Sequence, residues 1–114
     1  MDWITIIGSL LGPLLAKCFN QQSAENPKDY LAEHYDSTTG KMDASLVRSA
    51  IPATRRAIRK AYHNATPAER HEFPRYSKSE IYDIAEKKLI EGMNADESTL
   101  IGVFAAAAAL PDED

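Results

Sequence analysis

Apolar side chains recur along most of this chain at intervals of three and four residues, the spacing that one face of an α-helix produces. No segment alternates apolar and polar residues with the two-residue period of a strand, and no Asn-Gly or Asp-Gly pair marks a tight hairpin. The pattern therefore predicts an all-α fold, an irregular bundle of about five helices in a single domain over residues 1–114.

Capping residues indicate where these helices begin. Thr66 and Ser77 are each followed three residues later by a glutamate, the pattern of a capping box. The six expected caps are Asp2, Asn26, Asp43, Thr66, Ser77 and Asp96. The helical segments that they open are 3–20, 27–35, 44–64, 67–73, 78–91 and 97–110, with a polar loop at 36–40.

Prolines indicate where the helices are interrupted. Pro13 and Pro52 fall inside helical segments, where each lacks an N–H donor and clashes with the carbonyl four residues earlier. We expect a kink or a break at each position. Pro111 ends the last helix and is followed by a short acidic tail, 111–114.

The N-terminal helix, residues 1–20, is the most apolar part of the chain. Residues 3–16 are uncharged. Large apolar side chains cover most of the predicted helix surface, and the remaining side carries small residues instead of charged ones. Gly8 and Gly12 form a G-x-x-x-G pattern that lets helix backbones approach closely. Because such a helix is expected to be covered on all sides, we predict that it binds a protein partner or a second copy of the chain. The predicted interaction residues are Trp3, Ile4, Ile7, Gly8, Leu11, Gly12 and Leu14.

Two other interpretations of this helix stay open. In the first, it is the central core helix of the bundle. In the second, segment 3–19 anchors a peripheral membrane protein, with Trp3 and Phe19 at the level of the lipid head groups. A transmembrane span is not expected, because ~14 uncharged residues cover roughly 21 Å of a ~30 Å hydrocarbon core.

The charge of the chain is distributed unevenly. The total is −4, but residues 48–78 hold eight basic and two acidic residues, a net +6 between two acidic flanks. The basic helix 48–60 suggests nucleic-acid binding as an alternative function, since arginines offer a planar fork of donors to phosphate oxygens. Its candidate phosphate contacts are Arg48, Arg55, Arg56, Arg59 and Lys60. The competing interpretation is that the acidic flanks pair with these residues inside the fold.

Residues 98–110 are uncharged and contain five consecutive alanines, Ala105 to Ala109. Alanine has the highest helix propensity and gives a helix a narrow profile. We therefore expect a buried helix that packs closely on its neighbour, with docking to a partner as the alternative.

Catalytic and metal-binding motifs are not evident. The chain contains no phosphate-binding loop, G-x-S-x-G elbow, H-E-x-x-H pair or Rossmann glycine pattern. Its one cysteine, Cys18, excludes an internal disulfide and a multi-cysteine zinc site, and favours a reducing compartment. We expect no metal, no cofactor and no enzyme activity, and a cytoplasmic location with membrane association as the alternative.

One pair of residues suggests an enzyme. Arg56 and His63, with six residues between them, resemble the arginine–histidine pair of small all-helical HEPN-type nucleases. The resemblance implies a ribonuclease in which the arginine steadies the scissile phosphate and the histidine acts as general acid or base. The polar residue that follows the arginine in that pattern is Ala57 here. The main expectation remains a small accessory or regulatory interaction protein. Its length is typical of such proteins from bacteria and phages.

Overall fold

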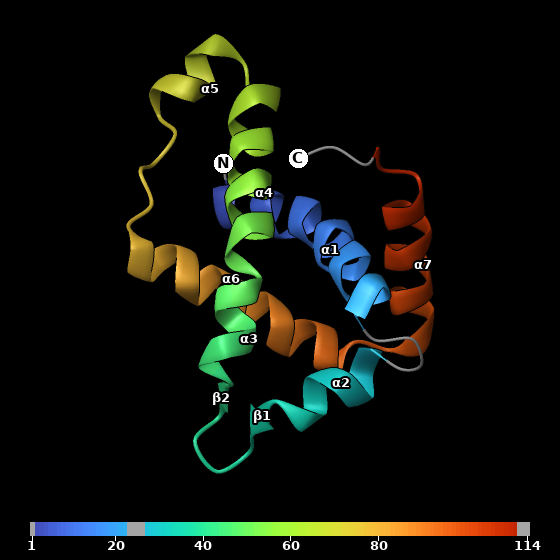
Figure 1. Cartoon of the computed structure of the whole chain (residues 1–114). Coiled ribbons are helices and arrows are strands. Elements are labelled where there is room, and N and C mark those ends of the chain that lie inside the picture. The colour runs from blue at the N-terminus through green and yellow to red at the C-terminus, as the bar shows by residue number, and fades with distance from the viewer. Residues whose placement is uncertain (1, 23–26, 112–114) are drawn as a thin grey trace.

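In a computed structural model, which describes residues 2–22 and 27–111, the chain forms seven helices and one short pair of strands (Figure 1). The helices are α1 (Trp3–Gln22), α2 (Pro27–Glu33), α3 (Ala44–Ser49), α4 (Ile51–Asn64), α5 (Pro67–His71), α6 (Lys78–Asn94) and α7 (Glu97–Ala108). The strands are β1 (Tyr35–Asp36) and β2 (Lys41–Met42). The predicted all-α fold class is confirmed.

Side-chain caps begin the helices where the sequence predicts them. In both capping boxes, the Thr66 and Ser77 hydroxyls accept the backbone N–H three residues later, and the glutamates there accept the N–H of the cap. The carboxylates of Asp2, Asp43 and Asp96 likewise accept N–H groups of the first turns that follow them. The sixth expected cap, Asn26, lies outside the described residues.

The two prolines inside helical segments have different effects. At Pro52 the predicted helix is broken into α3 and α4, and the proline occupies the first turn of α4. At Pro13, by contrast, α1 remains one helix, so no break occurs there. Leu11 and Leu14, on either side of Pro13, are buried. Their packing offsets the roughly 3 kcal/mol that an interior proline costs a helix.

Segment 35–42 differs from the prediction. The expected helix 27–35 ends at Glu33, and Tyr35–Asp36 pairs antiparallel with Lys41–Met42. Gly40 closes the connecting turn at φ +70°, a conformation that glycine adopts without strain. Strands of two residues are too short to produce a recognisable alternation, which is why the pattern did not reveal them.

Helix α1 lies at the centre of the core. It packs between α4 and α7, and α6 also contacts it (Figure 1). Its buried side chains join those of α2, α3, α4 and α6 in one cluster, which includes Ile7, Leu11, Leu14, Leu15, Phe19, Leu31, Val47, Ala57, Ala61, Ala85 and Leu89. The interpretation of the N-terminal helix as the central core helix is confirmed.

Candidate functional sites

Most of the interaction surface predicted on the N-terminal helix lies inside the protein. Ile7 and Leu11 are fully buried, and Leu14 is nearly so. The half-buried Trp3 packs its ring edge-on against Phe73, with 4.7 Å between the ring centroids. Within the predicted set, Ile4 is the large apolar side chain that faces solvent, at 40% exposure. Apart from Ile4, the large apolar residues of the set therefore pack inside the fold and do not form an exposed interaction surface.

The G-x-x-x-G pattern is covered by a lysine side chain. A Cβ on Gly8 would lie 3.9 Å from Nζ of Lys88, and a Cβ on Gly12 would lie 3.6 Å from Cε of the same residue. Nζ of Lys88 in turn lies 3.6 Å from Oε2 of Glu91, one turn further along α6. The small residues of α1 thus make room for the aliphatic part of Lys88.

The same burial bears on the membrane interpretation. Phe19 is 7% exposed and Trp3 is half-buried, so neither ring projects freely from the surface. Among residues 2–22 and 27–111, no helix is both long enough and apolar enough to cross a bilayer.

Helix α7 lies at the edge of the molecule and packs mainly against α1 (Figure 1). Ala107 is buried, and Val103 and Phe104 are half-buried. On the outer side, Ile101 is 64% exposed, and a Cβ on Gly102 would meet nothing within 4 Å. The expectation of a buried helix is therefore wrong for this face, because an apolar and uncharged helix surface lies in solvent. We call it the outer α7 face; its exposed residues are Ile101, Gly102, Ala105, Ala106, Ala108 and Ala109.

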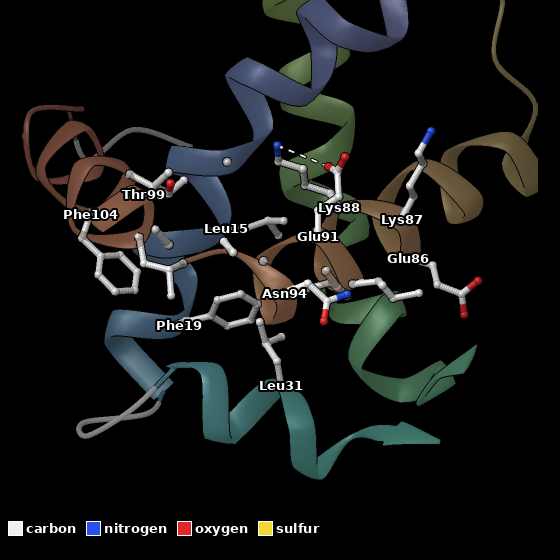
Figure 2. Close-up of a pocket in the computed structure, with 18 of the residues that line it drawn as sticks. Leu15, Phe19, Leu31, Glu86, Lys87, Lys88, Glu91, Asn94, Thr99 and Phe104 are labelled. Carbon is white, nitrogen blue, oxygen red and sulfur yellow. Dashed lines mark ion pairs between the residues drawn. The ribbon is translucent and has the colours of Figure 1, made fainter. Parts of the chain in front are cut away.

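A cavity of about 880 Å³ opens between α6 and α7, with α1 and α2 forming its other walls (Figure 2). In Figure 2 the Phe104 side chain extends from α7 at one side, Phe19 of α1 lies in the middle, and Leu31 points up from α2. The apolar side chains that line it are Leu15, Phe19, Leu31, Leu89, Ile90, Leu100, Val103 and Phe104. We call this space the α6–α7 cavity.

Charged residues on the rim of the cavity are largely neutralised. Nζ of Lys41 lies 3.8 Å from Oε1 of Glu86, and the buried carboxylate of Glu86 also accepts the backbone N–H of Met42 at 3.2 Å. Lys88 is paired with Glu91, as Figure 2 shows. Asp83 and Lys87 also line the cavity, but its walls are mainly apolar, which favours an uncharged apolar occupant.

The basic segment has a different environment. Arg48, Arg55 and Arg59 are exposed, and Arg56 and Lys60 beside them are half-buried. No ion pair within the described ranges involves a residue between 48 and 78. The interpretation in which acidic flanks neutralise this segment is therefore not supported. We call Arg48, Arg55 and Arg59 the arginine stripe.

An aromatic cluster lies at the C-terminal end of α4. The Tyr62 ring, 41% exposed, lies edge-on to Phe73 at 5.4 Å and to His63 at 5.6 Å. The Arg70 guanidinium lies 5.5 Å from the centre of the Tyr62 ring and donates to the carbonyls of Tyr62 and His63, at 3.1 and 2.8 Å. These contacts hold an exposed aromatic ring in a defined position.

Chemistry beyond binding has little support in the geometry. Arg56 and His63 lie two turns apart on α4, the former half-buried and the latter exposed, and the His63 ring packs edge-on against Tyr62. In the part of the chain that the structure covers, no group of three histidine, cysteine, aspartate or glutamate residues is placed to hold a metal ion. The nuclease interpretation thus rests on its residue spacing alone.

Carboxylates with displaced pKa values belong to caps and turns. Hydrogen bonds from the backbone N–H and hydroxyl of Ser77 lower the pKa of Glu80, and the Thr99 backbone N–H does the same for Asp96. Burial, followed by the charges of Glu80 and Asp2, raises the pKa of Tyr76. These shifts report local structure and do not mark a reactive group.

Comparison with known proteins adds no relative, since no family model, curated protein or solved structure matches the chain. The α6–α7 cavity is the feature that sequence reasoning missed, because it forms between helices whose relative placement no local pattern encodes. The uncharged run 98–110 was the signal closest to it.

Proposed function

We propose that this protein is a small non-enzymatic interaction protein that buries the outer α7 face and the mouth of the α6–α7 cavity against an apolar helix, and that a second copy of the chain supplies that helix. The observation that carries the proposal is the exposure of an uncharged apolar helix beside an apolar cavity. Helices that are apolar on all sides are normally covered.

Exposure of this face has an energetic cost in water. Full burial of an isoleucine side chain contributes about 1.5–3 kcal/mol, and Ile101 has 64% of its surface still to bury. The exposed alanines around it add apolar area without a charged residue among them. A contiguous apolar surface of this kind is typical of a protein contact.

The second copy is favoured because the two features complement each other. In a two-fold dimer the same patch meets itself, so each copy must offer both a projection and a recess. Here Ile101 projects from α7, and the cavity is lined by Leu100 and Phe104 of the same helix. Gly102 and the neighbouring alanines permit close backbone approach, and residues 98–110 bring no charge into a contact between two identical helices.

The size of the contact requires the cavity as well as the helix. A 12-residue helix is about 18 Å long, whereas a stable interface buries about 800 Å² on each partner. The outer α7 face alone is too narrow for that area. The residues of α6 that line the cavity must therefore take part.

The experiment measures the mass in solution by light scattering over a concentration series. We compare the unmodified protein with Ile101→Lys and with Ile4→Lys, a matched control in which an exposed isoleucine of α1 receives the same charge. We expect the unmodified protein and Ile4→Lys to dimerise and Ile101→Lys to remain monomeric with unchanged helical circular dichroism. An unmodified protein that is monomeric at every concentration overturns the proposal, as does dimerisation of Ile101→Lys. If Ile4→Lys alone loses the dimer, the dimer contact is made by the N-terminal helix and not by α7.

A further inference from the structure

We propose that the arginine stripe and Tyr62 together bind the phosphate backbone and one base of a single-stranded nucleic acid, without sequence preference. This inference uses a surface on the α4 side of α1 and does not depend on dimerisation through α7.

The stripe runs over two successive helices. Arg55 and Arg59 lie four residues apart on α4, which places them on one side of that helix, and Arg48 lies on α3, which directly precedes α4 (Figure 1). Successive positions four residues apart on a helix rise by about 6 Å. A row of cations at such intervals can follow a chain of phosphates.

The guanidinium groups of the stripe are available to a ligand. Side-chain exposure is high at all three positions, and no carboxylate within the described ranges pairs with them. Each guanidinium can therefore donate two parallel hydrogen bonds to a phosphate.

Tyr62 distinguishes a single strand from a duplex. It follows Arg59 by three residues, so it continues the same side of α4. Its ring is 41% exposed and is held by Arg70 and Phe73. The Arg70 guanidinium lies over one side of the ring, and the exposed remainder of the ring provides a stacking platform for an unpaired base, which a duplex lacks.

The experiment measures binding of a fluorescein-labelled oligothymidylate by fluorescence anisotropy, from about 0.05 to 0.2 M salt. Three phosphate contacts predict a slope of log K against log salt of about −2, which amounts to roughly a twentyfold loss of affinity over that range. Arg55→Gln/Arg59→Gln should reduce the slope to about −0.7 and weaken binding by roughly tenfold or more at 0.1 M salt.

Two sets of controls separate the site from the total charge and from folding. Lys78→Gln/Lys87→Gln removes the same charge from exposed positions of α6 and should change the affinity much less. Tyr62→Leu should weaken binding by about fivefold or more with an unchanged salt slope, and Tyr62→Phe should restore it because the ring is kept.

Several outcomes overturn the inference. One is an affinity that does not depend on salt, and another is an equal loss in the two double variants. A duplex of the same sequence that binds as tightly, with no effect of Tyr62→Leu, overturns the assignment to a single strand. Equal competition by polyglutamate of matched charge indicates an acidic protein ligand instead, and anionic vesicles that bind with the same dependence on Arg55 and Arg59 indicate a lipid surface.

Discussion

At the scale of single residues, the glycines of this chain differ in the space and the backbone conformation that surround them. Gly8 lies in α1 with the side chain of Lys88 as the nearest neighbour of its hypothetical Cβ, at 3.9 Å. Gly40 lies in the turn between β1 and β2 with φ +70°. The first position is open to a larger residue, whereas the backbone of the second excludes one.

This difference predicts opposite effects of the same substitution. Gly8→Ala should stabilise the fold by about 0.5–1 kcal/mol, because alanine restricts the unfolded chain and fits the helix. Gly40→Ala should destabilise it by about 1–2 kcal/mol, because a Cβ is unfavourable in the left-handed region. Urea denaturation of both variants against the unmodified protein measures the two changes. A destabilising Gly8→Ala would indicate that α1 needs the close helix approach that its G-x-x-x-G pattern permits.

At the scale of helices, features determined by a few neighbouring residues were predictable. Two capping boxes and the break at Pro52 depend on contacts within one turn, and all three are present. The continuity of α1 through Pro13 depends on packing from both sides, which no local pattern contains. The candidate sites follow the same division. The exposed side of α4 could be predicted from its own spacing, whereas the exposure of α7 depends on whether another helix covers it.

The caps also predict how stability depends on pH. Hydrogen bonds in the folded state lower the pKa of Asp2, Glu80 and Asp96 below their usual values of 3.8, 4.5 and 3.8. A group whose pKa is lowered on folding contributes stability above its unfolded pKa, and the contribution is lost as the pH falls through the folded pKa. The free energy of unfolding should therefore decrease as the pH falls below about 4.5.

Comparison of two variants by urea denaturation at several pH values checks this prediction. Glu80→Gln removes a capping carboxylate and should flatten the acid limb of the profile. Asp83→Asn removes an exposed carboxylate of the same helix that makes no capping hydrogen bond. In this variant the free energy of unfolding should still fall steeply with pH in acid, more steeply than in Glu80→Gln. Identical acid limbs in the two variants would show that the cap is not the source of the pH dependence.

At the scale of the whole molecule, the net charge of −4 conceals a separation of charge and of hydrophobicity. Helix α1 lies between α4, which carries the arginine stripe, and α7, which carries the outer apolar face. A dimer formed through α7 would therefore keep both stripes exposed, one on each copy. The fold thus separates the surface proposed for self-association from the surface proposed for nucleic acid.

If both proposals hold, the dimer should bind long single strands more tightly than the monomer does. An oligonucleotide that reaches both stripes makes the second contact within one complex, at a high effective concentration. We expect it to bind Ile4→Lys, which remains a dimer, more tightly than the monomeric Ile101→Lys, by up to about a hundredfold. An oligonucleotide that covers one stripe should bind the two variants equally, since both carry the same added charge. Equal affinities for the long strand, with the dimer verified by light scattering in the same buffer, would show that the two stripes are not positioned to engage one strand.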